Sequence, residues 1–301
     1  MNKLSIIIPA KNEEKGIGKL SVLKELYPEA EIIVVNDGST DKTKEVAESW
    51  AKVIDHPYSK GNGAAIKSGA RIATGDVLVF MDADGQHNPK DIEKLLDKMN
   101  EGFDLVVGAR DSTSQASFGR LAANSFYNKF GSWMVNHKIK DLTSGFRAVN
   151  AEKFKEFIYL LPNGFSYPTT STMAFFRAGY SVGYVSIVAS KREGSSHINI
   201  FKDGIRFLLI IFKVGTLYSP LKLFTPISFS VLALGLCRYV YTYFQNGTFT
   251  NMSALLFTTS LIIFLIGLVS EQITTLVYQS IDNKEDEQQS ETNIKQPLKS
   301  A

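Results

Sequence analysis

The sequence predicts an α/β fold in which helices flank a mostly parallel β-sheet, followed by a membrane region of two helices. Over roughly the first 110 residues, short runs rich in valine and isoleucine alternate with longer amphipathic segments. Strands and helices that alternate in this way form parallel sheets covered on both faces. Near the C-terminal end, residues 224–244 and 252–278 are apolar, and each stretch can supply the roughly 20 helical residues that cross a bilayer.

The strands and helices of the first region follow from its hydrophobic pattern. Four short apolar runs that are rich in β-branched residues predict strands over residues 4–8, 31–35, 77–81 and 105–107. The amphipathic segments between them predict helices over residues 13–26, 41–51, 61–73 and 89–100. A chain of 301 residues is long enough to bury a substantial core.

Composition argues against several classes of protein. The formal net charge of +3 is too small to indicate a nucleic-acid partner. The single cysteine, Cys237, excludes an internal disulfide framework. Residues 4–8 have the length of a strand and end at Pro9, so we expect no signal peptide at the N-terminus.

Polar side chains follow three of the predicted strands. Ile8 is followed by the residues PAKNE, Val35 by NDGSTD and Met81 by DADGQ. Ligands on parallel sheets bind beyond the carboxyl ends of the strands, so three such endings together predict one binding site. For Ser39 and Thr40, an equally good interpretation is that they cap the helix that follows.

Asp82 and Asp84 form a carboxylate pair at the end of an apolar strand. Two like charges a few ångströms apart repel each other unless a cation lies between them. Mg²⁺ and Mn²⁺ favour hard oxygen ligands and take carboxylates together with phosphate oxygens and water, and Gln86 offers a further oxygen. A paired general acid and base is the weaker alternative, because nothing apolar surrounds the pair to raise one pKa.

Residues 3–200 contain an ordered set of motifs. Four of them, SIIIPAKNEE, VVNDGSTDKT, KGNGAAIKSG and MDADGQHNP, resemble glycosyltransferase family 2 with its GT-A fold. GAR at residues 108–110, DLTSGFRA at 141–148 and KREGSSH at 191–197 narrow the resemblance to the dolichyl-phosphate mannosyltransferase and polyprenyl-phosphate glucosyltransferase group. The two apolar helices that follow are similar to those of its membrane-anchored members.

The resemblance implies three groups of site residues. A nucleotide sugar would bind to Pro9, Ala10, Asn12, Glu13, Asp37, Lys60, Gly63, Asp82, Ala83 and Asp84. Mg²⁺ or Mn²⁺ would bind to Asp82, Asp84 and Gln86 and neutralise the diphosphate. The phosphate of a polyprenyl lipid would bind to Arg110, Arg120, Asn124 and Arg192, since the planar guanidinium suits phosphate. The catalytic residues would be Asp82, Asp84, Arg110 and Arg192.

The activity that the resemblance implies is an inverting transfer of a hexose-type sugar from a nucleotide diphosphate to a polyprenyl phosphate, either undecaprenyl or dolichyl phosphate. A lipid monophosphate is already anionic near neutral pH, so its attack needs no general base. The four histidines therefore need not be catalytic, and we expect His87 to support the metal loop. A donor like UDP-glucose is slightly favoured, with GDP-mannose next.

Four segments are expected along the chain. They are a GT-A catalytic domain over residues 1–200, a juxtamembrane amphipathic helix over 201–219, a transmembrane hairpin over 220–280 and a disordered polar tail over 281–301. Basic residues before the first span place the catalytic domain and both termini in the cytoplasm, at the inner membrane. The hairpin also offers a surface for a homo-oligomer.

Two charged residues, Arg238 and Glu271, fall inside the predicted spans. Counted from the connecting loop, their depths differ by roughly 20 Å at about 1.5 Å per residue. We therefore expect no direct ion pair between them within one hairpin, and we expect Glu271 near the cytoplasmic interface.

Two other functions remain open from the sequence. A family 2 transferase acting on a lipid hydroxyl or a growing polysaccharide would need a base near its acceptor, and the Gln-x-x-Arg-Trp motif of processive synthases is absent. A non-catalytic membrane adaptor that senses sugar nucleotides would have no need for the intact set of Asp82, Asp84 and Gln86.

Overall fold

The computed structural model describes the backbone of residues 3–110, 118–164, 166–188, 212–213 and 215–295. Side chains are described for the same residues, apart from 118–124 and 280–295. The chain divides into two units, Met1–Asp203 and Gly204–Ala301. The first unit holds a β-sheet with its helices, and the second holds two long helices.

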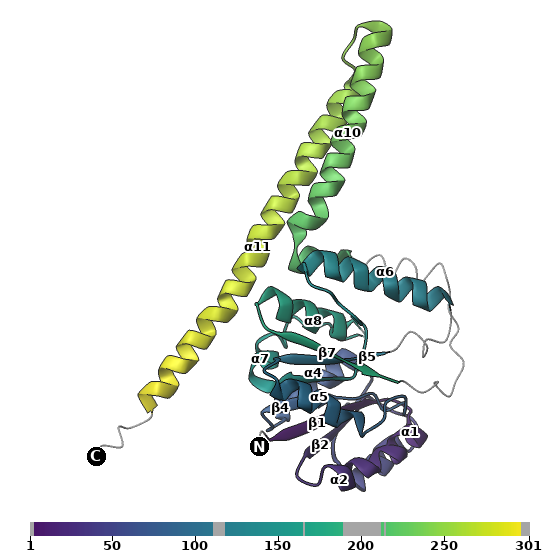
Figure 1. Ribbon diagram of the computed structural model, residues 1–301, viewed down its shortest axis with the longest axis vertical. Helices are drawn as coiled ribbons and strands as arrows, with labels where there is room; N and C mark the ends of the chain where they lie inside the picture. The colour runs from purple at the N-terminus through teal and green to yellow at the C-terminus, as the bar shows by residue number, and fades with distance from the viewer. Residues whose placement is uncertain (1–2, 111–117, 165, 189–211, 214, 296–301) are drawn as a thin grey trace. The chain divides into compact units, whose positions relative to one another are not determined.

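The first unit is built on a seven-stranded sheet in the order β3-β2-β1-β4-β6-β5-β7 (Figure 1). The strands are β1 (Leu4–Ala10), β2 (Glu31–Asn36), β3 (Lys52–Asp55), β4 (Val77–Phe80), β5 (Leu105–Arg110), β6 (Arg147–Asn150) and β7 (Val182–Ile187). Neighbouring strands are parallel except at β6, which is antiparallel to both β4 and β5. The prediction of a mostly parallel sheet is therefore confirmed.

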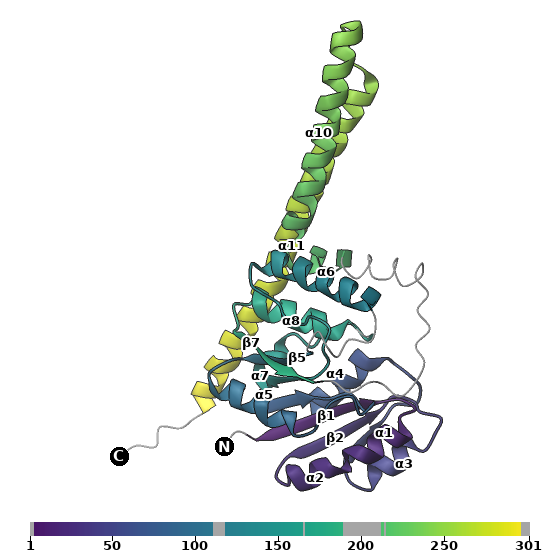
Figure 2. The ribbon, with the colours of Figure 1, turned by 45° about the vertical axis from the view of Figure 1, so that its right-hand side comes forward.

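Helices lie on both sides of this sheet (Figures 1 and 2). They are α1 (Glu14–Lys19), α2 (Leu23–Leu26), α3 (Thr43–Glu48), α4 (Asn62–Ile72), α5 (Asp91–Asn100), α6 (Phe118–Val135), α7 (Ala151–Glu156) and α8 (Tyr167–Arg177), with a 3₁₀ turn, η1 (Leu20–Val22), between α1 and α2. On one face of β1, Ile6 and Ile8 pack with Ile17 of α1. On the other face, Ile7 lies against Gly69 of α4. Successive residues of β1 are thus buried on opposite faces, as in a strand covered on both sides.

Some elements differ from those that the sequence predicts. Strands β3, β6 and β7 were not expected. β3 is only half buried and begins and ends with the charged residues Lys52 and Asp55, so it shows no apolar run. The single helix predicted over residues 13–26 is divided into α1, η1 and α2. Two glycines in α1, Gly16 and Gly18, lower its helix propensity.

Gly16 allows α1 to approach the loop that follows β4. A Cβ atom at residue 16 would lie 2.1 Å from the carbonyl oxygen of Ala83. Two residues further along the same helix, a Cβ atom at Gly18 would lie 3.6 Å from Val46 Cγ1, which is an ordinary contact. The loop that carries Asp82 and Asp84 therefore packs directly on the backbone of α1.

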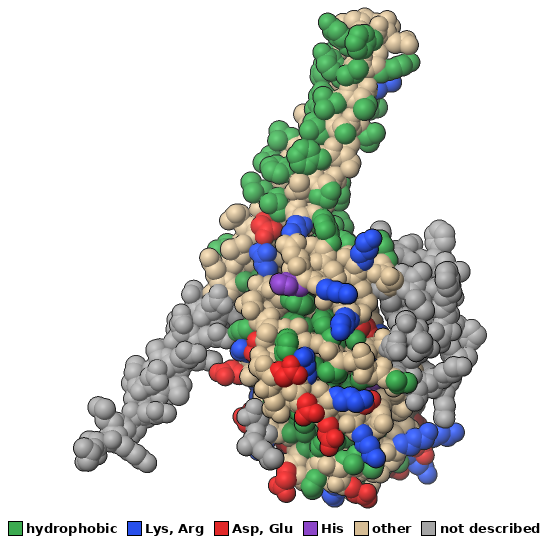
Figure 3. All heavy atoms as spheres, in the orientation of Figure 1, with side chains coloured by type: hydrophobic (Ala, Val, Ile, Leu, Met, Phe, Trp, Pro, Cys, Tyr) green, Lys and Arg blue, Asp and Glu red, His purple; other side chains and the backbone are tan. Residues whose placement is uncertain are grey.

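The second unit contains α10 (Pro220–Asn246) and α11 (Asn251–Lys295). Residues 220–246 and 251–279 are long and apolar enough to cross a membrane, which confirms the two predicted apolar helices. On the face drawn in Figure 3, hydrophobic side chains gather over this hairpin. Exposed apolar residues occur on both helices, among them Leu234, Tyr241, Leu261 and Ile262.

The two helices meet along a line of small residues that we call the seam. Its members are Ser228, Gly235 and Thr242 of α10 and Ser253, Ser260, Gly267 and Thr274 of α11, all of them buried and spaced seven apart in each helix. The Ser228 hydroxyl donates to the Ser260 carbonyl at 2.9 Å, and the Ser260 hydroxyl donates to the Ser228 carbonyl at 3.0 Å. Small residues let helix backbones approach closely where no water competes for hydrogen bonds.

Glu271 binds the first turn of α10. Its Oε2 atom accepts a hydrogen bond from the backbone N–H of Leu221 at 3.2 Å, where a helix leaves N–H groups without partners and favours negative charge. The described residues show no ion pair between Arg238 and Glu271. This separation agrees with the different depths that the sequence predicts for the two residues.

The end of α11 differs from the expected disordered tail. The helix continues to Lys295, so residues 281–295 are helical in the structure. This stretch lacks glycine and proline and is rich in glutamate, glutamine and lysine, which are good helix formers. The predicted juxtamembrane helix over 201–219 falls largely outside the described residues.

Candidate active site

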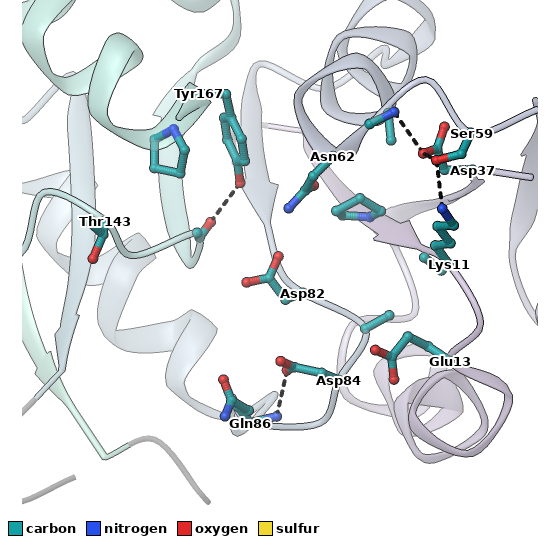
Figure 4. A pocket seen from close by; sticks show the side chains of 17 residues that line it. Lys11, Glu13, Asp37, Ser59, Asn62, Asp82, Asp84, Gln86, Thr143 and Tyr167 are labelled. Atoms are coloured by element: carbon teal, nitrogen blue, oxygen red, sulfur yellow. Dashed lines mark hydrogen bonds between the residues drawn. The ribbon is translucent and has the colours of Figure 1, made fainter. Parts of the chain in front are cut away.

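A cavity of about 440 Å³ opens beyond the carboxyl ends of β1, β2 and β4. It is lined by Pro9, Ala10, Lys11, Glu13, Asp37, Ser59, Gly61, Asn62, Ala65, Asp82, Ala83, Asp84, Gln86, Thr143, Gly145, Tyr167 and Pro168. Figure 4 shows that the labelled side chains come from segments far apart in the sequence and face one space. The three polar strand endings therefore come together, as their pattern predicted.

The carboxylates of Asp82 and Asp84 lie on one wall of this cavity, with Gln86 beside them (Figure 4). The backbone N–H of Gln86 donates to Asp84 Oδ1 at 3.1 Å, which bends the loop after β4. Burial raises the pKa of the Asp82 carboxyl; His87 opposes this, and the like charge of Asp84 adds to it. A cation between these carboxylates would remove that repulsion.

The oxygen atoms of this wall fit a hard divalent cation. Two carboxylates and one amide are typical of a Mg²⁺ or Mn²⁺ site that takes its remaining ligands from phosphate and water. Among the residues that the structure describes, no group of three or more His, Cys, Asp or Glu side chains could hold a metal ion on protein ligands alone. The donor set thus suits a metal that binds together with a phosphate ligand.

Asp37 is a buried hydrogen-bond acceptor at the end of β2. Its Oδ1 atom contacts His56 Nδ1 at 2.8 Å and the backbone N–H of Lys60 at 2.8 Å. Its Oδ2 atom accepts from the Ser59 hydroxyl at 2.8 Å and from the backbone N–H of Gly61 at 2.9 Å. Burial acts to raise the pKa of this carboxyl, but these donors together hold it below its usual value.

The other ring nitrogen of His56 contacts α4. Its Nε2 atom lies 2.9 Å from the Ser68 hydroxyl, so the imidazole links the end of β3 to both Asp37 and the helix. Asp37 itself contacts the loop over residues 59–61, which forms part of the cavity wall. In this structure Asp37 organises the wall, and its four acceptor positions are already used by the protein.

Replacing Asp37 with asparagine is expected to lower the free energy of unfolding by about 1–3 kcal/mol near neutral pH, because buried donors lose their acceptor. The pKa of Asp37 is lower in the folded than in the unfolded chain. Its stabilisation is therefore present above the unfolded value of about 3.9 and is lost as pH falls through the folded value. Urea unfolding of both proteins at pH 7 and pH 3 tests this. An equal difference at both pH values would contradict it.

The loop after β1 is tied to the loop after β2 through Asn12. Asn12 has a positive φ of 54°, and its Oδ1 atom accepts from the backbone N–H of Thr40 at 2.8 Å. The Asn12 N–H donates to the Ser39 hydroxyl at 3.0 Å. Ser39 and Thr40 therefore hold two loops together, and their interpretation as helix caps is wrong. Among the described residues, Asn12 does not line the cavity, whereas Glu13 does.

Two other residues that were predicted to bind the nucleotide sugar, Gly63 and Lys60, lie behind the cavity wall. Gly63 packs α4 against the chain at 162–164, because a Cβ atom there would lie 2.1 Å from the carbonyl oxygen of Pro162. Lys60 reaches Asp37 through its backbone N–H. Neither of them lines the cavity, while their neighbours Gly61 and Asn62 do.

Arg110, at the end of β5, is held by Asp141. Its Nε and Nη2 atoms donate to the two carboxylate oxygens of Asp141 at 2.8 and 3.1 Å, and Nη2 also donates to the Thr143 hydroxyl at 2.6 Å. Arg110 does not itself line the cavity, but Thr143 does. The side chains of Arg120 and Asn124, in α6, and the whole of Arg192 lie outside the described residues.

A further part of the cavity wall contains residues that were not among the predicted site residues. Thr143, Gly145, Tyr167 and Pro168 come from the chain around β6 and α8. The motif DLTSGFRA includes the first two of them. Tyr167 belongs to no such sequence motif. Its hydroxyl donates to the carbonyl of Gly145 at 3.3 Å.

His87 packs under the carboxylate loop. Its ring stacks on Phe146 with centroids 4.9 Å apart, and its Nε2 atom lies 4.0 Å from Asp82 Oδ2. It is buried and does not line the cavity. This position agrees with a supporting role.

Two family models match this chain, one over each of its two parts. The family model described as glycosyl transferase family 2 matches residues 5–158, and the one described as GtrB C-terminal hairpin matches residues 219–276. The polyprenol monophosphomannose synthase of Mycolicibacterium smegmatis is 30% identical over 62% of this chain and 77% of its own length. The dolichol-phosphate mannosyltransferase of Pyrococcus furiosus is 36% identical over 54% of this chain and 50% of its own length.

A solved structure supports the fold. The glucosyl-3-phosphoglycerate synthase of Mycobacterium tuberculosis, solved with Mn²⁺, UDP-glucose and phosphoglyceric acid, superposes with a TM-score of 0.58 at 22% identity. The match covers 71% of this chain and 79% of that one. The sheet, the ordered motifs and both family models agree. The chain belongs to glycosyl transferase family 2 and carries a GtrB-type C-terminal hairpin.

Proposed function

We propose that the protein transfers a hexose-type sugar from a nucleotide diphosphate sugar to a polyprenyl phosphate, with inversion at the anomeric carbon. The observation that carries this proposal is the cavity beyond β1, β2 and β4, where Asp82 and Asp84 face a space lined by Asp37 and its loop. Cavities of about 300–1,000 Å³ bind small molecules, and this one has about 440 Å³. Relatives named as polyprenyl- and dolichyl-phosphate transferases support the acceptor class.

The donor would lie with its nucleoside against the loops after β1 and β2 and its diphosphate at the loop after β4. Asp82, Asp84 and Gln86 would hold Mg²⁺ or Mn²⁺, which would neutralise the departing diphosphate. Pro9, Ala10 and Glu13, from the end of β1 and the loop after it, also line the cavity. Asn12, Lys60 and Gly63 would then act by placing the loops rather than by touching the donor.

The acceptor phosphate would be held by arginines. Arg110 uses Nε and Nη2 for Asp141 and Thr143, and no described residue accepts a hydrogen bond from Nη1. Arg120, Asn124 and Arg192 complete the proposed phosphate site. A lipid monophosphate is already anionic near neutral pH and needs no general base.

The remaining parts of the proposal concern the sugar and the membrane. A UDP-glucose-like donor is favoured over GDP-mannose. The hairpin of α10 and α11 would span the inner membrane, with the catalytic unit and both termini in the cytoplasm. Its exposed apolar side chains, such as Leu234 and Leu261, would form the interface of a homo-oligomer.

The decisive experiment compares a phosphate acceptor with a hydroxyl acceptor on the same lipid. The purified full-length chain in liposomes receives radiolabelled UDP-glucose, GDP-mannose or UDP-N-acetylglucosamine with either undecaprenyl phosphate or undecaprenol. We expect transfer from one donor to undecaprenyl phosphate and at least a hundredfold less to undecaprenol, because the alcohol must lose a proton to a general base, whereas the phosphate is already anionic.

Two outcomes would contradict the proposal. Equal transfer to undecaprenol would favour the transferase that acts on hydroxyl groups. Tight binding of a nucleotide sugar without turnover on either lipid would favour the non-catalytic adaptor. Liposomes without protein, and protein without lipid acceptor, measure the background hydrolysis of the donor.

A further inference from the structure

Arg147, the first residue of β6, is completely buried. Its Nη1 atom donates to the carbonyl of Pro168 at 2.8 Å and to the hydroxyls of Ser171 and Thr172 at 2.8 and 3.1 Å. Its Nη2 atom donates to the carbonyl of Ser144. All these partners are neutral, and the Nε atom has no hydrogen-bond partner among the described residues.

The positive charge of Arg147 has no described carboxylate in contact with it. None of the described acidic residues lies within ion-pair distance of its guanidinium. Fully buried arginines are rare unless they are paired, because an isolated charge loses its hydration. Arg110 shows the usual arrangement, with both oxygens of Asp141 on its guanidinium. Arg147 thus differs from Arg110 in contacting no described carboxylate. A negative charge near Arg147 would compensate its buried positive charge.

The contacts of Arg147 lead directly to the cavity wall. Pro168 lines the cavity, and Ser144 is followed by Gly145, which also lines it. A Cβ atom at Gly145 would lie 2.7 Å from Asp82 Oδ2, so the wall touches the carboxylate of Asp82. The guanidinium also lies 5.9 Å from the ring of Tyr167, another wall residue. Only one layer of chain therefore separates this charge from the proposed diphosphate.

We propose that Arg147 is a positioning residue whose buried charge attracts the diphosphate of the donor through the wall formed by Ser144, Gly145 and Pro168. This inference rests on the proposed function and adds to it a cationic group that touches neither substrate nor metal. Burial lowers the pKa of the Arg147 guanidinium, and Tyr167 and Tyr184, followed by the carboxylates of Asp141 and Asp82, act in the opposite direction. Of these acidic residues, Asp82 lines the cavity.

A charge in this position has two effects of opposite sign. It stabilises an anionic ligand in the cavity and disfavours a free cation bound to Asp82 and Asp84. Arg147→Gln should therefore weaken diphosphate binding and strengthen binding of Mn²⁺ alone. A residue that only packs the wall would weaken both when it is replaced.

The first test measures the affinity of the full-length protein for uridine, UMP and UDP, and for the matching guanine series, by calorimetry. For Arg147→Gln we expect UDP affinity to fall about tenfold, UMP affinity less, and nucleoside affinity to stay within about twofold. Arg71→Gln, which removes an exposed positive charge from α4, is the control for net charge. An equal loss along the series, or none, would overturn the inference.

The second test measures Mn²⁺ binding without nucleotide by electron paramagnetic resonance. Arg147→Gln should bind Mn²⁺ at least about threefold more tightly than the wild type, and weaker or unchanged binding would overturn the inference. Arg147→Lys keeps the charge without the planar fork. It should retain the wild-type ratio of UDP to nucleoside affinity even where its melting temperature falls. Loss of that ratio would also overturn the inference. The lysine variant therefore tests the inference even if Arg147→Gln does not fold.

These results separate the inference from the proposed function. A wild type that binds UDP or GDP but transfers no sugar to undecaprenyl phosphate would refute the function and leave the charge effect to be measured by binding. An active wild type whose Arg147→Gln variant loses nucleoside and diphosphate affinity equally would refute only the inference.

Discussion

Replacing Asp84 with alanine is expected to lower turnover by roughly 10²–10⁴-fold in a protein that remains folded, since several kcal/mol of charge stabilisation on the leaving diphosphate is lost with the metal. Asp84 lies in the loop after β4, faces the cavity and is only partly buried. Its removal takes away a charge without leaving a cavity in the core. Radiolabelled sugar transfer and the melting temperature are measured on the same preparation.

Asp97→Ala is the matched control for Asp84→Ala. Asp97 is an exposed residue of α5, in the helix that follows the carboxylate loop, and its replacement should leave both turnover and stability nearly unchanged. Excess EDTA should reproduce the effect of Asp84→Ala in the wild type. Full activity of the wild type in EDTA would show that the carboxylates act without a metal.

Gly16→Ala is expected to reduce both stability and activity by displacing the loop that carries Asp82 and Asp84. The new Cβ atom would lie 2.1 Å from the carbonyl oxygen of Ala83, a distance at which backbone must move. Overpacking of this kind lowers the free energy of unfolding by about 1–3 kcal/mol. Ala83 lies between Asp82 and Asp84, so the displacement also disturbs both carboxylates. The variant should therefore unfold at a lower urea concentration than the wild type and transfer less sugar.

The neighbouring Gly18→Ala separates packing from helix propensity. Both glycines belong to α1, and alanine favours a helix over glycine by about 1 kcal/mol. At residue 18 the new Cβ atom meets only Val46 Cγ1, at 3.6 Å, so this variant should be as stable as the wild type or more so. If the two variants behaved alike, the close approach of α1 to the carboxylate loop would not be important.

The first half of the sheet was predictable because its strands carry strong, short-range signals. β1, β2, β4 and β5 are apolar runs buried on both faces, and parallel geometry brings their carboxyl ends to one edge. The polar residues that follow β1, β2 and β4 could therefore be assigned to a single site from their positions in the sequence. Asp82 and Asp84 are the clearest case, since the structure places both in the cavity.

The second half was less predictable because its elements depend on long-range contacts. β6 has four residues, begins with a buried arginine and pairs antiparallel with two strands that come earlier in the chain. Nothing local in the sequence specifies that pairing. Tyr167 reaches the cavity only because α8 is placed by this arrangement. The motif DLTSGFRA indicated that this region is important, but it did not show which of its side chains line the cavity.

The role of Asp37 also lay beyond sequence reasoning. Its place at a strand end suggested a residue that binds the donor, and it does line the cavity. The structure adds His56 and the N–H groups of Lys60 and Gly61 as its partners. These come from a part of the chain about twenty residues further on, and backbone donors leave no trace in a sequence.

The seam of the hairpin has a consequence for how the anchor can change over evolutionary time. Ser228, Ser260 and Gly267 contact the opposite helix and leave no space for a larger side chain, since a Cβ atom at Gly267 would lie 2.6 Å from Phe224 Cβ. Outward residues such as Leu234 and Ile262 are exposed and can be exchanged for other apolar residues. Related hairpins should therefore drift freely in sequence at most positions, while small residues persist at every seventh one.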